Sequence, residues 1–299
     1  MAEADRNKAT LSIVVYLALT FALSSIFYVL VIRRTGLGQG IGHLALGLMW
    51  CPGISGLLTR FIFQHNLHGH GFSWGKAKYQ FASYWIPLVY ASAVYLPVWF
   101  AGYFNSTSPI FTGFALRFPR IPHAAALPLF FLILATVGVL SSCVSALGEE
   151  LGWRGFLVPQ LAKVIPFPRV AFVSGIIWAL WHYPIILFST AYRGAGPLWY
   201  TVACFTVMVV GLSFLFAWMR LKSGSVWTGM ILHASHNLFI QAFFDPLTRR
   251  AKVTDLWTTE FGAGLAIAAV IIGVIFYAKA GELPDTAEAA TPSFTDALK

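Results

Sequence analysis

Residues 127–144 read LPLFFLILATVGVLSSCV, and residues 145–157, which follow directly, read SALGEELGWRGFL. The first stretch is apolar enough for the interior of a lipid bilayer, whereas the second brings two carboxylates and an arginine to its end. Glu149 and Glu150 are the only acidic residues of the sequence between Asp5 and Asp245. An apolar run that ends in such isolated charges predicts a membrane helix that carries a polar site.

The composition of the chain indicates a polytopic membrane protein. Its 299 residues are 58% hydrophobic and 10% charged, and the mean hydropathy is +0.72, whereas soluble domains are about 25% charged. The net charge of +9 is spread between apolar runs and forms no basic block, which favours lipid head groups over nucleic acid as the partner. The three cysteines show no zinc or disulfide spacing.

The apolar runs predict an all-α fold with about eight transmembrane helices that enclose a membrane-embedded polar cavity. A bilayer core about 30 Å thick needs about 20 helical residues. The expected spans are 11–32, 41–63, 81–104, 125–148, 169–189, 198–219, 226–244 and 259–279. The second contains Cys51-Pro52-Gly53, which predicts a kink or a break in that helix.

The predicted organisation is one transmembrane domain with short flanking segments. Residues 1–10 form a short polar N-terminus, residues 11–279 the membrane domain with its motif-bearing core at 125–245, and residues 280–299 a disordered tail rich in acidic residues, Ser, Thr and Pro. An even number of spans puts both termini on one side. A small excess of Lys and Arg in the loops of that side predicts cytoplasmic termini.

The charged segment after residue 144 divides into two parts by helical spacing. Glu150 and Arg154 are four residues apart and share a helix face, so they can form a charge-assisted pair. Glu149 lies about 100° around the helix, away from that pair. This predicts a bracing role for Glu150 and Arg154, and a general-base role for Glu149. The alternative is that all three charges are solvated at a helix end.

Two later spans also carry polar residues at membrane depth. Residues 175–187, GIIWALWHYPIIL, contain His182 flanked by Trp178 and Trp181, and the alternative to a catalytic role is a hydrogen bond to a carbonyl group.

In residues 227–239, WTGMILHASHNLF, His233 and Asn237 share one helix face and His236 lies beside it. A neutral His donor and an Asn amide could stabilise an oxyanion, and the alternative is a polar clasp between helices. Because buried polar groups need partners, Glu149, His182, His233 and Asn237 are expected to converge on one cavity.

Together these motifs resemble the signature of the type II CaaX prenyl protease family, also called CPBP or ABI. The motifs in chain order are Glu149-Glu150-x-x-x-Arg154, an aromatic residue (Trp178) four positions before His182, and His233-x-x-x-Asn237. The resemblance covers residues 125–245, and the motifs fall on successive predicted spans. The family usually has phenylalanine where this chain has Trp178.

The resemblance implies an intramembrane endopeptidase. In that family's mechanism Glu149 and His182 would activate a water molecule, His233 and Asn237 would hold the oxyanion, and Glu150 and Arg154 would brace the site. Family members that act on prenylated proteins remove the three residues after the lipidated cysteine. The implied partner is a prenylated CaaX-type protein or another membrane-associated protein within the lipid bilayer. The sequence does not predict an oligomeric state.

The sequence favours no cofactor, and a zinc ion is the alternative that it leaves open. Two histidines and a carboxylate are a zinc ligand set, so Glu149, His182 and His233 would be the ligands. The chain has no His-Glu-x-x-His motif, and glutamate-activated water without a metal is the favoured chemistry. A second histidine tract, His65, His68 and His70, lacks a neighbouring acid or cysteine.

Two other functions are compatible with the same residues. A relative that keeps the protease scaffold could act in bacteriocin immunity or as a membrane-protein partner without a prenylated substrate. A proton-coupled transporter could use the Glu and His residues as a relay. No inverted repeat is evident in the sequence, which weighs against the transporter.

Overall fold

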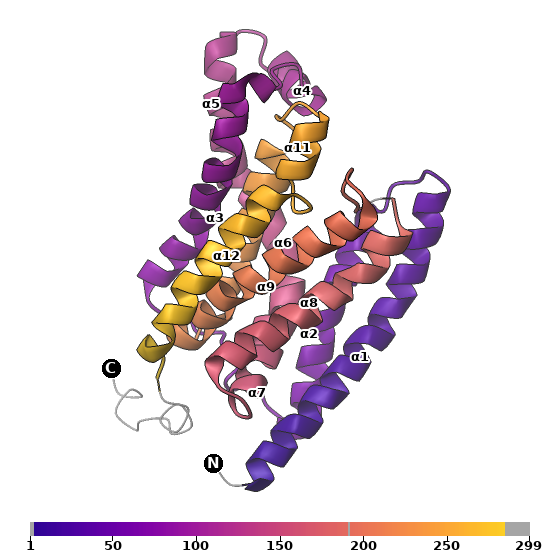
Figure 1. Cartoon of the computed structure of the whole chain (residues 1–299). Coiled ribbons are helices and arrows are strands. Elements are labelled where there is room, and N and C mark those ends of the chain that lie inside the picture. The colour runs from indigo at the N-terminus through magenta and orange to yellow at the C-terminus, as the bar shows by residue number, and fades with distance from the viewer. Residues whose placement is uncertain (1–2, 191, 285–299) are drawn as a thin grey trace.

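The computed structural model describes residues 3–190 and 192–284, which form a bundle of helices (Figure 1). The α-helices of the described chain are α1 (Glu3–Gly36), α2 (Gly42–Gln64), α3 (Ala77–Val98), α4 (Pro109–Arg117), α5 (His123–Ile133), α6 (Val139–Gly152), α7 (Val158–Ala162), α8 (Phe167–Phe188), α9 (Leu198–Ser223), α10 (Val226–Asn237), α11 (Lys252–Trp257) and α12 (Ala263–Ala278). Continuing some of these helices are the π-helical segments η1 (Trp99–Tyr103), η2 (Leu134–Gly138), η3 (Trp153–Leu157) and η4 (Leu238–Phe244), and the 3₁₀ segment η5 (Lys279–Glu282).

The predicted all-α membrane fold is confirmed. Seven helices in the described part of the chain are long and apolar enough to cross a bilayer, and this chain is an integral multi-pass membrane protein. The predicted span at 226–244 is also helical, as α10 followed by η4, but it is not one of the seven. Its polar residues, which include His233, His236 and Asn237, lower its mean hydropathy.

The helices alternate in direction along the bundle, and both ends of the described chain lie at the same end of it (Figure 1). The same arrangement is consistent with the predicted even number of passes, in which the helical segment α10–η4 would be the eighth. The short helices α4 and α11 lie at the opposite end (Figure 1). There an isolated antiparallel bridge joins Phe104 to Thr248 and ties the end of η1 to the end of η4.

The outermost helices extend beyond the predicted spans. Helix α1 begins at Glu3, within the segment predicted as a polar N-terminus, and α12 continues through η5 to Glu282. The predicted disordered tail at 280–299 therefore begins with helical residues. Residues 285–299 of that tail lie outside the described residues.

Helix α6 is seated against α2 through small residues at close range. A Cβ atom added at Gly152 would lie 2.4 Å from the carbonyl carbon of Pro52, and one added at Gly53 would lie 2.4 Å from the carbonyl oxygen of Gly148. Side chains at these positions would force the helices apart, because packed backbones leave no room for them. Of the two predicted alternatives at Pro52, the break is wrong, because α2 runs uninterrupted from Gly42 to Gln64, whereas the kink stays a prediction. Pro52 forms part of this contact.

Candidate active site

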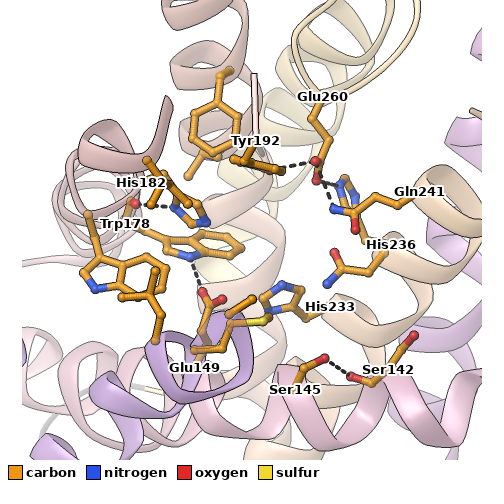
Figure 2. Close-up of a pocket in the computed structure, with 18 of the residues that line it drawn as sticks. Ser142, Ser145, Glu149, Trp178, His182, Tyr192, His233, His236, Gln241 and Glu260 are labelled. Carbon is orange, nitrogen blue, oxygen red and sulfur yellow. Dashed lines mark hydrogen bonds and ion pairs between the residues drawn. The ribbon is translucent and has the colours of Figure 1, made fainter. Parts of the chain in front are cut away.

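A cavity with a volume of about 470 Å³ lies inside the bundle (Figure 2). The structure brings together the four residues that the sequence expected to converge, since all of them line this cavity: Glu149 from α6, His182 from α8, and His233 and Asn237 from α10. Trp178 and His236, the two weaker candidates, line it as well. The roles of these residues stay predictions.

Two indole groups hold the carboxylate of Glu149 in place. The Nε1 atoms of Trp153 and Trp178 both donate to its Oε2 atom, at 3.2 and 2.7 Å, and the second bond is visible in Figure 2. The residue is 2% exposed. Its Oε1 atom has no hydrogen-bond donor among the described residues, so this oxygen can accept a proton from a molecule in the cavity.

A backbone carbonyl group fixes the protonation pattern of His182. The Nδ1 atom lies 2.9 Å from the carbonyl oxygen of Trp178, and because a carbonyl oxygen only accepts, Nδ1 carries the hydrogen. In the neutral ring the Nε2 atom therefore has a free lone pair. The rings of Trp181 and Phe205 pack against the imidazole, at 4.8 and 5.1 Å between centroids. Trp178 thus contacts both candidate bases, through its indole and through its backbone.

His233 is bound to a residue that the sequence did not assign to it. Its Nδ1 atom donates to Oε1 of Glu150 at 2.9 Å, because the carboxylate only accepts. A neutral His233 then presents an acceptor at Nε2, so the expected neutral donor to an oxyanion is incompatible with this hydrogen bond. Only the protonated ring keeps the bond to Glu150 and also has an Nε2–H group.

The predicted pair between Glu150 and Arg154 is present and fully enclosed. Arg154 Nη1 lies 2.9 Å from Glu150 Oε1, and the two side chains are 2% and 0% exposed. The guanidinium carbon lies 4.2 Å from the ring centroid of Trp178 and 4.0 Å from that of Phe216. The planar cation is therefore enclosed between aromatic rings, a geometry in which Arg and Lys are not equivalent.

The helix behind Glu149 changes its hydrogen-bond register just after the charged segment. In η3 the N–H of Val158 donates to the carbonyl of Trp153, five residues back. The next donor in this register would be Pro159, which has no N–H, so the carbonyl of Arg154 is left without a helical partner. Arg220 Nε supplies the missing donor at 2.8 Å.

The loop at 65–71 completes this support. Arg220 Nη2 also donates to the carbonyl of Gly69, at 2.9 Å. His70 Nε2 lies 3.0 Å from the carbonyl of Leu151. Burial, together with the nearby cations Arg60 and Arg220, lowers the pKa of His70 to about 4, so the ring is neutral and Nε2–H donates. His70, the last residue of the second histidine tract, therefore braces the candidate active-site helix.

A second polar cluster at the cavity was missed from the sequence. Glu260 accepts hydrogen bonds from Tyr192, His236 and Gln241, and all four residues line the cavity. His236 also bonds the hydroxyl of Tyr90 through Nδ1, at 2.5 Å. The only available signal was an isolated acid, Glu260, at the start of the last predicted span.

The candidate zinc ligands do not form a metal-binding group. Within residues 3–190 and 192–284 no three His, Cys, Asp or Glu side chains are grouped closely enough to hold a metal ion. The residues present therefore do not fit zinc in this arrangement.

The central part of the chain is similar to known proteins. Residues 122–239 match the family model described as type II CAAX prenyl endopeptidase, Rce1-like. A protein of Methanococcus maripaludis named CAAX prenyl protease 2 is 28% identical over 149 residues, which make up 48% of this chain and 49% of that protein. The chain thus spans about half the length of the curated relative it matches. The matched segment carries Glu149, His182 and His233.

Removal of Arg154 tests the enclosed ion pair. Arg154→Met keeps apolar packing between the rings but leaves the buried Glu150 carboxylate with His233 alone, so we expect the free energy of unfolding to fall by about 3–5 kcal/mol. Unfolding in detergent micelles, followed by tryptophan fluorescence, measures this change.

Arg250→Met is the matched control, because Arg250 pairs with Asp255 through a side chain that is 58% exposed. Its loss should change the free energy of unfolding by about 0–1 kcal/mol. Equal losses in the two variants would contradict the importance of burial for Arg154.

Proposed function

Because residues 122–239 match the family model of Rce1-like type II CAAX prenyl endopeptidases, we propose that this chain is a membrane-embedded endopeptidase. The observation that carries the proposal is the arrangement of Glu149 and His182 around one cavity. Each has one fixed atom and one atom without a partner in the described chain, Oε1 and Nε2. Two such acceptors facing one cavity are suited to the activation of a water molecule.

In the proposed first step the water oxygen attacks the carbonyl carbon of the scissile peptide bond. Glu149, through Oε1, accepts the proton that the water loses, and the lone pair of His182 Nε2 accepts the hydrogen bond from the second O–H group. Withdrawal of the proton in the transition state by a positioned base contributes about 10²–10⁴-fold to the rate. The burial of Glu149, which is 2% exposed, favours this step, because charges interact more strongly in a low dielectric.

The resulting oxyanion needs donors on the other side of the carbonyl carbon. Asn237 lines the cavity and offers its amide N–H groups. His233 offers an Nε2–H group when it is protonated, with Nδ1–H kept on Glu150. The charge of Glu150 would stabilise that imidazolium, so the Glu150–Arg154 pair supports the oxyanion site through His233.

Collapse of the tetrahedral intermediate completes the proposed reaction. The C–N bond breaks, its electron pair goes to the leaving nitrogen, and the proton held by Glu149 is transferred to that nitrogen. The products are a carboxylic acid and an amine, and Glu149 returns to its ionised state. No step in this sequence passes through a metal ion.

The proposed substrate is a membrane-associated protein, and a prenylated CaaX-type C-terminus is its most specific form. The name of the Methanococcus maripaludis relative supports this substrate. Apolar side chains also line the cavity, among them Met49, Ile185, Phe205, Met208 and Leu212. An apolar wall beside a polar centre suits a lipidated peptide, since the lipid chain avoids water while the peptide bond meets the bases.

We further propose that both termini face the cytoplasm. The two ends of the described chain lie at one end of the bundle (Figure 1), and the loops on that side carry the small excess of Lys and Arg. A C-terminal fusion to green fluorescent protein should be fluorescent in bacterial cells, because the fluorophore matures poorly after export. A C-terminal green fluorescent protein fusion without fluorescence, together with an active C-terminal alkaline phosphatase fusion, would contradict this orientation.

Cleavage of a farnesylated CaaX peptide by purified protein tests the proposed reaction. Glu149→Gln removes the proton acceptor while it keeps the shape of the side chain, so kcat should fall by about 10²–10⁴-fold. Glu282→Gln is the matched control, since Glu282 makes an exposed pair with Lys279, and its kcat should equal that of the wild type.

Full activity in Glu149→Gln would contradict the glutamate mechanism. Loss of activity with a chelator, and recovery with zinc, would indicate a metal-dependent reaction instead. A transporter would be favoured if the wild type cleaves no peptide but drives proton-coupled flux in liposomes. A non-catalytic partner role would be favoured if a membrane phenotype of the wild type survives in Glu149→Gln.

Trp178→Phe tests the indole that joins the two candidate bases. The change restores the residue usual in the resembling family and removes one N–H donor to Glu149, at 2.7 Å. A hydrogen bond to a charged group contributes about 1.5–3 kcal/mol, so kcat/KM should fall by about tenfold to a hundredfold. Steady-state cleavage of the same peptide measures the effect.

The control for this substitution is Trp218→Phe. Trp218 also donates its indole N–H, to the carbonyl of Lys279 at 3.0 Å, but it does not line the cavity. Its kcat/KM should stay at the wild-type value. A Trp178→Phe enzyme as active as this control would show that the bond to Glu149 has no part in the reaction.

A further inference from the structure

Glu260 is a buried carboxylate of the cavity that the proposed reaction does not use. It lies in the connection at 258–262 between α11 and α12 and is 6% exposed. Three donors surround it: His236 Nε2 at 3.0 Å, the hydroxyl of Tyr192 at 2.6 Å and Gln241 Nε2 at 3.0 Å. In Figure 2 it lies on the opposite side of the cavity from Glu149.

The charge of Glu260 is maintained despite its burial. Burial alone would raise the pKa of this carboxyl group, but the hydrogen bonds from His236, Tyr192 and Gln241 outweigh that effect and hold the pKa below its ordinary value. The carboxylate is therefore ionised at neutral pH. A phenol hydroxyl that donates to an ionised carboxylate makes one of the stronger hydrogen bonds in proteins.

Tyr192 connects Glu260 to one of the candidate bases. It lies in the connection at 189–197 between α8 and α9, and its ring centroid is 6.0 Å from that of His182. The ring of Phe261, the residue after Glu260, packs against Tyr192 at 5.0 Å. The Tyr192 side chain is thus held at its hydroxyl by Glu260 and along its ring by Phe261.

His182 has few other restraints on its orientation. Within the described residues its only hydrogen bond is the one from Nδ1 to the Trp178 carbonyl, which leaves the ring able to turn about that bond. The aromatic neighbours Trp181 and Phe205 limit the turn from within the helical bundle. Tyr192 limits it from the connecting segment.

We propose that Glu260 is a positioning residue: its carboxylate holds the hydroxyl of Tyr192, and the ring of Tyr192 holds His182 in the orientation that directs Nε2 into the cavity. The catalytic value of that orientation rests on the proposed function, whereas the orientation itself does not. A different role, in which Glu260 only clasps the 258–262 segment to α10, predicts that His182 is unaffected by changes at Tyr192.

The orientation of His182 is measurable without any substrate. In protein labelled with ¹⁵N-histidine, long-range proton–nitrogen spectra distinguish the two neutral tautomers, and His182→Gln identifies the signal by its loss. The wild type should show one sharp Nδ1–H form. Tyr192→Phe, which keeps the ring, and Glu260→Gln, which keeps an oxygen acceptor, should both broaden or split this signal.

Tyr200→Phe is the matched control for Tyr192→Phe. The hydroxyl of Tyr200 donates to the carbonyl of Leu256 at 2.5 Å, so the substitution also removes one tyrosine hydrogen bond near α11, but Tyr200 does not line the cavity. Its His182 signal should equal that of the wild type. If Glu260→Gln does not fold, the comparison of Tyr192→Phe with Tyr200→Phe decides the question.

Peptide cleavage then shows whether Glu260 acts through Tyr192. Each single variant should lower kcat by about threefold to tenfold, the effect expected for one hydrogen bond, with KM unchanged. The double variant should lose no more than Glu260→Gln alone, because both changes break one connection. Independent, multiplicative losses, or an unchanged His182 signal in both single variants, would overturn the proposal. A changed signal in a protein whose wild type cleaves no peptide would reject the peptidase function and keep the positioning role.

Discussion

The buried carboxylate of Glu150 is the interaction on which the rest of the site depends. One of its oxygens receives both Arg154 from the η3 segment and His233 from α10, so a single charge fixes the relation between two membrane passes. Burial of an ionised carboxylate without partners costs free energy, and so does burial of the Arg154 cation without the carboxylate. This reciprocal requirement keeps α6, η3 and α10 in one arrangement. Glu149, the neighbouring residue, gains a fixed position from it.

The backbone around this charge is adapted to the same purpose. Close contact of Gly152 with Pro52 seats α6 on α2, and the π-helical turn after it exposes a carbonyl that Arg220 covers. Short π-helical segments occur often at functional sites, because they redirect side chains at the cost of a regular hydrogen bond. Here the lost bond is replaced from α9. The helix that carries the candidate base is thus supported on two sides by other elements.

Local features of the site could be predicted from the sequence, and features that depend on tertiary structure could not. The Glu150–Arg154 pair follows from a spacing of four residues on one helix. The bond from His233 to Glu150 spans 83 residues, and no periodicity encodes it. The place of Glu260 in the cavity also depends on tertiary structure. In the sequence it stood at the start of a predicted span, whereas in the structure it lies in a connection that turns it toward the cavity. The seven apolar helices of the described chain were predictable because a bilayer imposes their length.

The two oxygens of Glu149 are not equivalent, and this has a consequence for the energetics of the reaction. Oε2 is held by indole groups from η3 and α8, so rotation of the carboxylate is already prevented in the resting protein. The entropy of ordering this group is lost during folding and not during each turnover. In the proposed peptidase the base would meet every substrate in the same preorganised state, and little reorganisation would remain for the transition state.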